Sequence, residues 1–126
     1  MAKVDPLRVQ ALQATHAIEL LANKWRIPIL HILRDGPLRT GAIQGAISEV
    51  SAKVLTQTLR GMERDGLLVR DVFDAVSKRV EYRLTPMGSS LIGPLGDLCR
   101  WAKTHEKDRD RARKRFDASA LAKGAK

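Results

Sequence analysis

Four side chains that donate hydrogen bonds recur along the stretch from Ser51 to Gly66. Successive members of the set are four, three and four residues apart, the spacing that places side chains on one face of a helix. They are Lys53, Gln57, Arg60 and Arg64. Long donors of this kind match the acceptors on base-pair edges and on phosphates in a DNA major groove. Taken alone, however, the stretch is more typical of an ordinary solvated amphipathic helix.

The opposite face of the same stretch is apolar, which predicts a helix anchored to a core. Its members are Leu55, Leu59 and Met62, supported by Val54 and Thr58. Ser51 is a suitable N-cap, because its hydroxyl can accept from a free backbone N–H, and Gly66 is a suitable stop. We therefore predict a helix over residues 51–65 with one buried face and one basic face.

Three helices are expected before this one. Apolar residues recur at helical spacing over residues 7–22 and 24–34, and a shorter helix is expected over residues 39–46. The side chains expected to be buried in the second and third helices are Trp25, Ile29, Leu30, Leu33, Ile43 and Ile47. Pro28 lacks an N–H, so the second helix should begin close before it or be distorted there.

The period of the sequence changes from helical to strand-like after Gly66. Residues 67–73 and 79–84 have the composition of two strands, which a loop tipped by Lys78 and Arg79 joins into a hairpin. A two-stranded hairpin directly after a basic helix is typical of a DNA-binding wing, which here would cover residues 67–84.

The last part of the chain begins with a helix signal at Thr85 and Pro86. A helix is expected over residues 86–105, with a kink near Pro94. Its apolar stripe consists of Leu91, Leu95, Leu98 and Ala102. Residues 106–126 form a basic tail, in which same-sign neighbours at four-residue spacing weaken an isolated helix. The tail is either a second, non-specific DNA contact or a solvated terminus.

The charge of the chain narrows the choice of partner. The 126 residues carry a formal net charge of +9, which argues for nucleic acid or an anionic membrane surface. The excess lies in residues 24–85, with eleven basic and seven acidic side chains, and in residues 103–126, with nine and four. Aromatic residues make up only 4%, which counts against a protein that stacks single-stranded bases.

The cysteine count and the hydropathy pattern indicate where in the cell the protein is expected. Cys99 is the only cysteine, so no internal disulfide framework is possible and a reducing cytoplasm is expected. The chain has no apolar run of 18 residues, so no membrane-spanning helix is expected.

The order of the expected elements describes a winged helix-turn-helix. From residue 24 onward, three helices, a strand, a basic loop and a second strand follow one another, and the last of these three helices, over residues 51–65, carries the basic face. The fold class predicted is mainly α with a small β-hairpin (α+β). A single domain is expected over residues 1–105, flanked by the basic tail over residues 106–126.

A set of short motifs between Ile18 and Trp101 occurs in this same order. The set comprises Asn23-Lys24-Trp25, Ile29-Leu30, Gly36-Pro37, Arg39, Ser51, Lys53, Leu55-Thr56, Leu59-Arg60, Glu63, Asp65-Gly66-Leu67, Arg70, Val80-Glu81-Tyr82, Leu84-Thr85, Gly88, Leu91, Pro94 and Trp101. At these spacings the chain resembles the HxlR-type winged helix-turn-helix regulators, which are MarR-like bacterial transcription factors.

The resemblance implies a homodimer that represses a palindromic operator. In such a dimer the helices over residues 7–22 and 86–105 pair across a two-fold axis, and each helix at Ser51 enters a major groove. The chain departs from the family's usual pattern in having Ala22-Asn23 before the Lys-Trp pair and Thr40 in place of an aromatic residue. Leu12 stands where many members carry a sensing cysteine, so a thiol switch at that position is not implied.

The predicted DNA contacts come from three elements. They are Ser51, Ala52, Lys53, Thr56, Gln57 and Arg60 on the basic helix, Arg39 at the start of the third helix, and Lys78 and Arg79 on the wing. Gln57 could read adenine in a bidentate manner and Arg60 could read guanine. Contact with phosphate alone is an equally open role for Arg60.

A further set of predictions concerns ligands other than DNA. Candidates for a small-molecule effector pocket are Leu12, His16, Trp25 and Trp101, although such tryptophans are more often core or dimer-interface residues. Cys99 is expected to be a buried small hydrophobe rather than a reactive thiol. The three histidines are far apart in the sequence, and no metal site, cofactor site or catalytic constellation is predicted.

These observations favour a sequence-specific regulator that binds double-stranded DNA and is not an enzyme. Two alternatives stay open. A non-specific or architectural DNA-binding protein would show little preference between an operator and random DNA. A protein-interaction module would use the wide apolar helices to bind a partner chain, with the basic charge incidental.

Overall fold

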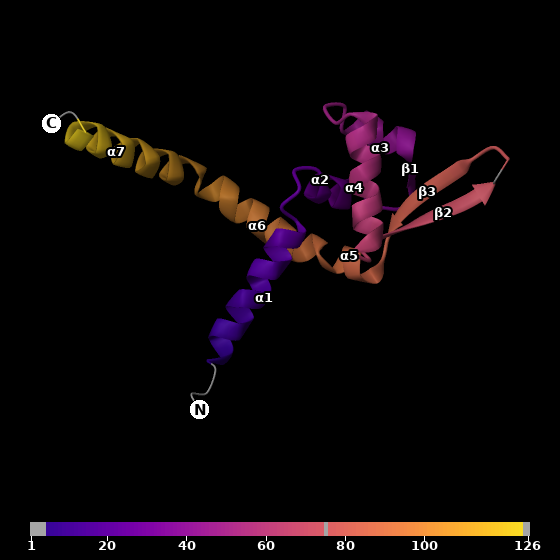
Figure 1. The fold of residues 1–126 in the computed structure, drawn as a ribbon, viewed down its shortest axis with the longest axis horizontal. Helices are drawn as coiled ribbons and strands as arrows, with labels where there is room; N and C mark the ends of the chain where they lie inside the picture. The colour runs from indigo at the N-terminus through magenta and orange to yellow at the C-terminus, as the bar shows by residue number, and fades with distance from the viewer. Residues whose placement is uncertain (1–4, 75, 125–126) are drawn as a thin grey trace. The chain divides into compact units, whose positions relative to one another are not determined.

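The structure, a computed structural model, describes residues 5–74 and 76–124. Helices dominate this part of the chain, and short strands form one antiparallel sheet (Figure 1). In chain order the elements are α1 (Pro6–Leu20), α2 (Arg26–Leu33), β1 (Leu38–Arg39), α3 (Thr40–Ala46), α4 (Ala52–Arg64), β2 (Leu68–Asp74), β3 (Arg79–Leu84), α5 (Pro86–Ser90), α6 (Ile92–Thr104) and α7 (Glu106–Gly124). The predicted class, mainly α with a small β-hairpin, is confirmed.

The chain divides into two compact units, residues 1–92 and residues 93–126. The first unit holds the elements from α1 to α5 and the sheet, and the second holds α7 with nearly all of α6. Among the described residues, none of the helices combines the length and apolar character needed to span a membrane.

The core of the first unit lies where α2, α3 and α4 meet the sheet. Its fully buried side chains come from each of these elements and from the turn before β2, and they are Ile29, Leu30, Leu33, Ile43, Leu55, Leu59, Met62, Leu67 and Leu68. The predicted inward faces of the second, third and fourth helices are therefore confirmed. Trp25 and Val54 were expected among the buried residues, and both expectations are wrong. Trp25 precedes α2 and is half-buried, while Val54 lies at the edge of its helix face and is exposed.

The predicted wing is present as a hairpin of β2 and β3. Its antiparallel register runs from Leu68 opposite Leu84 to Asp74 opposite Arg79, with an irregularity between Val72 and Asp74. The sequence did not predict β1, which pairs with the free edge of β3 and gives the sheet the order β1-β3-β2. A strand of two residues is too short to show an alternating pattern, so only its pairing partner reveals it.

The helix expected over residues 86–105 is two helices. The interruption falls at Leu91, between α5 and α6, so the kink predicted near Pro94 is misplaced. Pro94 lies in the first turn of α6, where a backbone N–H has no intrahelical partner in any case. The predicted cap is confirmed, because the Thr85 hydroxyl accepts from the N–H of Gly88 at 3.0 Å.

The tail is helical over Glu106–Gly124, where the sequence indicated only weakened helix formation. Backbone hydrogen bonds continue across the junction with α6, from His105 N to Trp101 O at 3.1 Å and from Arg109 N to His105 O at 2.9 Å. Because α7 extends an existing helix, it does not need to form a new first turn, which is the costly step of helix formation. This saving in free energy outweighs the repulsion between like charges in α7. None of the described residues of α7 is buried.

Candidate nucleic-acid interface

A short turn connects α3 to α4 and sets the direction of the second helix. Ile47 and Val50 are buried in this turn, and the Gln44 amide donates to the Val50 carbonyl oxygen. The Ser51 hydroxyl then accepts from the N–H of Val54 at 3.2 Å, which confirms the predicted N-cap. These contacts form a helix-turn-helix in which α4 is the second helix.

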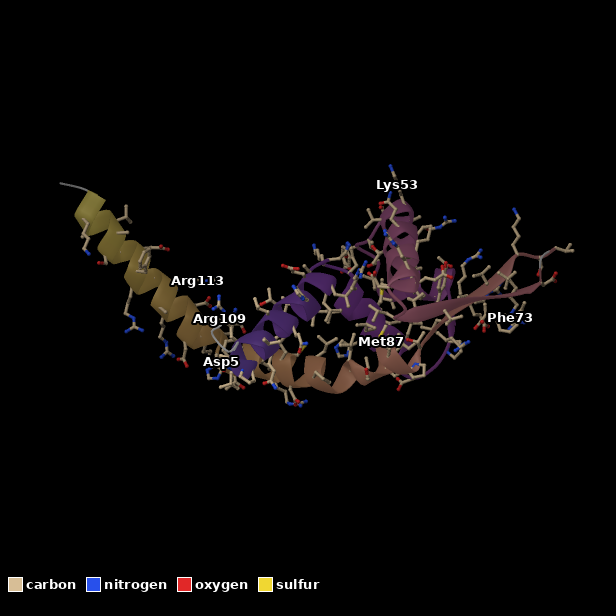
Figure 2. All side chains as sticks on the ribbon, turned by 60° about the horizontal axis from the view of Figure 1, so that its bottom comes forward. Asp5, Lys53, Phe73, Met87, Arg109 and Arg113 are labelled. Atoms are coloured by element: carbon tan, nitrogen blue, oxygen red, sulfur yellow. The ribbon has the colours of Figure 1, made fainter. Side chains whose placement is uncertain are left out.

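Helix α4 is two-faced in the manner that its sequence predicts. Leu55, Leu59 and Met62 have no exposed surface, whereas the donors on the other side are exposed. Figure 2 shows Lys53 near the N-terminal end of the helix, with its side chain directed away from the helix. The exposed predicted contacts of this helix and its cap are Ser51, Ala52, Lys53, Thr56, Gln57 and Arg60.

Thr56 presents a methyl group rather than a hydroxyl. Its Oγ1 donates to the Ala52 carbonyl oxygen at 2.9 Å, inside the helix. The hydroxyl is thus already engaged, while the methyl group stays on the exposed surface beside the small side chain of Ala52. These two residues can supply apolar contact to a thymine methyl group, beside the hydrogen-bonding side chains of Lys53 and Gln57.

Hydrogen bonds order the tip of the wing. Donation from the Ser77 side chain, together with the backbone N–H groups of Val76 and Ser77, lowers the pKa of Asp74. Lys78 adopts a left-handed backbone conformation with φ of 55° and is exposed, as predicted for the loop. The described part of the tip therefore places one ammonium group in solvent beyond the end of the strands.

Arg79 differs from Lys78 in having partners. Its guanidinium lies 3.3 Å from a Glu81 carboxylate oxygen and over the Phe73 ring, 5.6 Å from the centroid. Figure 2 shows Phe73 on the hairpin. Arg83 is similarly paired with Asp71, at 2.9 Å. The positive charge of Arg79 is therefore partly offset by the Glu81 carboxylate.

Arg39 lies at the junction of β1 and α3. It is the N-cap residue of α3 and is exposed, and its backbone pairs with Glu81 in the sheet. Its side chain makes no capping hydrogen bond to the helix. The predicted role of Arg39 as a phosphate contact stays a prediction, now from a position fixed by both a helix and a strand.

A hollow next to the exposed face of α4 gathers charged side chains from two elements. Its volume is about 400 Å³, and its lining consists of Arg60, Glu63 and Arg64 from α4 and Arg70 from β2. Arg64 was on the predicted basic face but was not among the predicted contacts. The sequence alone assigns Arg70 no contact, because its place beside α4 depends on how the strand returns along the helix.

The candidate effector residues do not stand in equivalent surroundings. Leu12 and Trp101 expose 55% and 54% of their surfaces, His16 is exposed, and Trp25 is half-buried beneath the Lys24 ammonium, 4.8 Å from its ring centroid. The high exposure of Leu12 and Trp101 is typical of surfaces that a partner covers. The effector pocket stays a prediction.

Cys99 is exposed in α6, so the expectation that it is buried is wrong. Among the described residues of α6, only Leu95 is buried. Among the residues that the structure describes, no group of three or more His, Cys, Asp or Glu side chains is placed to hold a metal ion.

Comparisons with known proteins agree with this geometry. The sequence model of a family described as HxlR-like helix-turn-helix matches residues 20–110. A helix-turn-helix-type transcriptional regulator of Methanothermobacter thermautotrophicus is 40% identical over 89 residues, which cover 71% of this chain and 68% of that protein. The regulator YkvN of Bacillus subtilis is 39% identical over 83 residues, covering 66% and 70%.

Solved structures are similar in fold as well as in sequence. A MarR-family transcriptional regulator from Enterococcus faecalis superposes with a TM-score of 0.69 and 33% identity, covering 88% of this chain and 97% of that one. The reduced form of the regulator YodB from Bacillus subtilis gives a TM-score of 0.66 and 29% identity, covering 79% and 92%. These similar proteins are transcriptional regulators rather than enzymes.

Proposed function

This chain belongs to the HxlR-like helix-turn-helix family of transcriptional regulators, and from that membership we propose that it is a dimeric repressor of a palindromic operator. The observation that carries the proposal is the two-faced helix α4. Its anchor residues are fully buried, its N-terminus is capped by Ser51, and Lys53 and Gln57 project from the exposed face. A helix held rigidly on one side can present these donors to base edges in a fixed register.

The reading of bases is assigned to the N-terminal half of α4. Gln57 can make two hydrogen bonds to adenine, and the Thr56 methyl group can contact the methyl group of a thymine. Residues near the N-terminus of a recognition helix are the ones that reach deepest into the groove. The operator half-site should therefore contain at least one A·T pair.

A homodimer is supported by the surface of α1. None of its described residues is buried, and Leu7, Leu12 and Ile18 are between 55% and 73% exposed. Apolar side chains that recur along one helix need a covering surface, and a second copy of the chain supplies the same surface across a two-fold axis. Two copies of α4 would then meet DNA about one helical turn apart.

Selection of bound duplexes from a random pool tests this proposal. We expect the wild-type protein to enrich a palindrome with half-sites about 10 base pairs apart, centre to centre. With Gln57→Ala, discrimination at one A·T pair of each half-site should fall by about 1–3 kcal/mol, while the other positions keep their preference. Transcription from a promoter that carries the palindrome should fall when the protein is added.

The outcomes separate the remaining alternatives. Enrichment of no consensus, with tight binding to every duplex, would favour a non-specific or architectural DNA-binding protein. A protein-interaction module would bind no duplex at low salt. Its elution in size-exclusion chromatography would be the same with and without DNA.

The wing should contribute a salt-dependent part of the affinity. Lys78→Ala should reduce the slope of log affinity against log salt by about 0.9, the value for one released counterion. Arg79→Ala should reduce it by less, because Glu81 already offsets the guanidinium at 3.3 Å. Fluorescence anisotropy of a labelled duplex over a sodium chloride series measures both slopes. Arg83→Ala, which removes an arginine paired with Asp71, is the control for net charge. An unchanged slope in the Lys78/Arg79 double variant would show that the tip of the wing does not contact phosphate.

A further inference from the structure

The basic face of α4 continues beyond the helix. Arg60 and Arg64 are the last two donors of the exposed stripe, and Arg70 joins them from β2 across the hollow of about 400 Å³. Arg70 pairs in register with the buried Tyr82, so both side chains belong to the same face of the hairpin. Three guanidinium groups from two elements thus border one open space.

The backbone between the two elements holds this arrangement in place. The N–H of Leu67 donates to the Met62 carbonyl oxygen at 2.9 Å, and Gly66 adopts a φ of 77° between the helix and the strand. The direction in which β2 leaves α4 is therefore set by the turn itself. Arg70 does not depend on a mobile loop to reach the hollow.

The charges in the hollow are not matched by carboxylates. Among the described residues, no carboxylate oxygen lies within 4.0 Å of the guanidinium nitrogens of Arg60, Arg64 or Arg70, and all three side chains are exposed. Asp65, which directly follows Arg64 in the chain, is paired instead with Arg26 at 2.6 Å. Glu63 is the single carboxylate of the lining, so the hollow keeps an excess of positive charge.

The position of the hollow along α4 indicates what it binds. The N-terminal half of a recognition helix reaches the bases, so its C-terminal half lies at the margin of the groove, where the phosphates are. Guanidinium groups donate to phosphate oxygens with the fork geometry that those oxygens favour. We propose that Arg60, Arg64 and Arg70 form a clamp for one or two backbone phosphates of the DNA duplex, a proposal that rests on the proposed function.

This assignment decides between the two roles open to Arg60. A guanidinium that shares a hollow with two others is drawn to the strongest nearby negative charge, which is phosphate rather than a guanine edge. Arg60 therefore sets the position of α4 in the groove without reading sequence, and discrimination rests on the residues from Ser51 to Gln57.

The test uses the full-length chain and a labelled 20-base-pair duplex of random sequence, so no operator is required. Arg64→Gln and Arg70→Gln should each reduce the slope of log affinity against log sodium chloride, by up to about 0.9, the value for one released counterion. Glu63→Gln should have the opposite sign and bind the duplex roughly two- to fivefold more tightly, because it removes the only carboxylate of the lining. Arg34→Gln is the matched control, since that arginine is already 3.5 Å from Asp35 and lies outside the hollow. Its slope should equal that of the wild type.

The outcomes distinguish a failure of the clamp from a failure of the proposed function. Binding by the wild type, with slopes unchanged in Arg64→Gln and Arg70→Gln, would overturn the clamp and leave DNA binding intact. Absence of wild-type binding at low salt would overturn both.

Titration with inorganic phosphate, followed by NMR, tests for a free anion as the ligand. Saturable phosphate binding that Arg70→Gln abolishes, with unchanged DNA slopes, would overturn the assignment to the DNA backbone. Near-wild-type melting temperatures for all four variants are expected, since each side chain is exposed.

Discussion

Gly88→Ala should lower the free energy of unfolding by roughly 3 kcal/mol, at the upper end of the usual cost of overpacking. A methyl group on Gly88 would lie 2.0 Å from the Leu67 carbonyl oxygen and 3.0 Å from its carbonyl carbon. Both are backbone atoms, so no side chain can turn aside to make room. The start of α5 would have to separate from the turn that joins α4 to β2.

Two hydrogen bonds that would break in that separation explain the size of the effect. The Thr85 hydroxyl donates to the Gly66 carbonyl oxygen at 2.6 Å, and the N–H of Thr85 donates to the Leu67 carbonyl oxygen at 3.1 Å. Both bonds join the segment before α5 to the turn that follows α4. We therefore expect weaker DNA binding to accompany the loss of stability, because the same turn directs α4 and the wing.

Chemical denaturation at one fixed protein concentration measures the change, with a melting temperature lower by roughly 10 °C as a second readout. Gly45→Ala is the matched control, because apart from its chain neighbours and the backbone of its own helix, no described atom lies within 4 Å of the position that its methyl group would occupy. That variant should be more stable by about 0.5–1 kcal/mol, as expected for glycine replaced within a helix. Equal stability of Gly88→Ala and the wild type would contradict the close approach of α5 to Leu67.

Arg26→Met should lower the free energy of unfolding by about 2 kcal/mol. One nitrogen of the Arg26 guanidinium lies 2.6 Å from an Asp65 carboxylate oxygen and 3.0 Å from the Leu20 carbonyl oxygen. The side chain of Arg26 is only 15% exposed, so its removal leaves a poorly solvated carboxylate and a free carbonyl group. The loss is smaller than for a fully buried pair, because the Asp65 side chain is 33% exposed and water can partly solvate its carboxylate.

Arg26 also joins the end of α1 to the end of α4, which are far apart in the sequence. Leu20 is the last residue of α1 and Asp65 is the C-cap residue of α4. Loss of the guanidinium should therefore loosen the recognition helix relative to the helix proposed to form the dimer. The affinity should be measured at a temperature where Arg26→Met is folded, so that unfolding does not reduce the amount of active protein. Under that condition we still expect the variant to bind the selected operator less tightly than the wild type does.

A double-mutant cycle with Asp65→Asn isolates this interaction. The double variant should be less destabilised than the sum of the two single variants, because each single change already removes the ion pair. Arg34→Met supplies the control, since Arg34 and Asp35 form an exposed pair at 3.5 Å that should contribute less than about 1 kcal/mol. Additive effects in the cycle would show that Arg26 and Asp65 do not interact energetically.

The helices and the hairpin could be predicted from the sequence because their signals are local. The N-caps at Ser51 and Thr85 and the change of period after Gly66 each involve side chains within a few residues of one another. The misplaced kink has the same origin. Pro94 is a strong local signal, but a proline in a first turn distorts nothing, and the interruption at Leu91 leaves no comparable mark in the sequence.

The candidate site was predictable only where it lies within one element. Lys53, Gln57 and Arg60 share a face of α4 by virtue of their spacing, and the structure exposes that face. Of the two partners of Arg79, only Glu81 is close in sequence, two residues away. Phe73 reaches Arg79 from the opposite strand, so the sequence alone does not indicate that contact. The pairing of the two strands must therefore be known before one can say whether a charged side chain on the wing has a partner.

The sequence by itself determined that this chain forms a winged helix-turn-helix with a basic, capped second helix, because helical period, capping and strand alternation are short-range properties. Only the tertiary structure decided which charges are free to meet DNA. Asp65 is paired with Arg26 from another helix, and Arg70 is brought beside Arg64 by the turn at Gly66. Those pairings depend on distances between residues remote in the chain, and no local pattern encodes them.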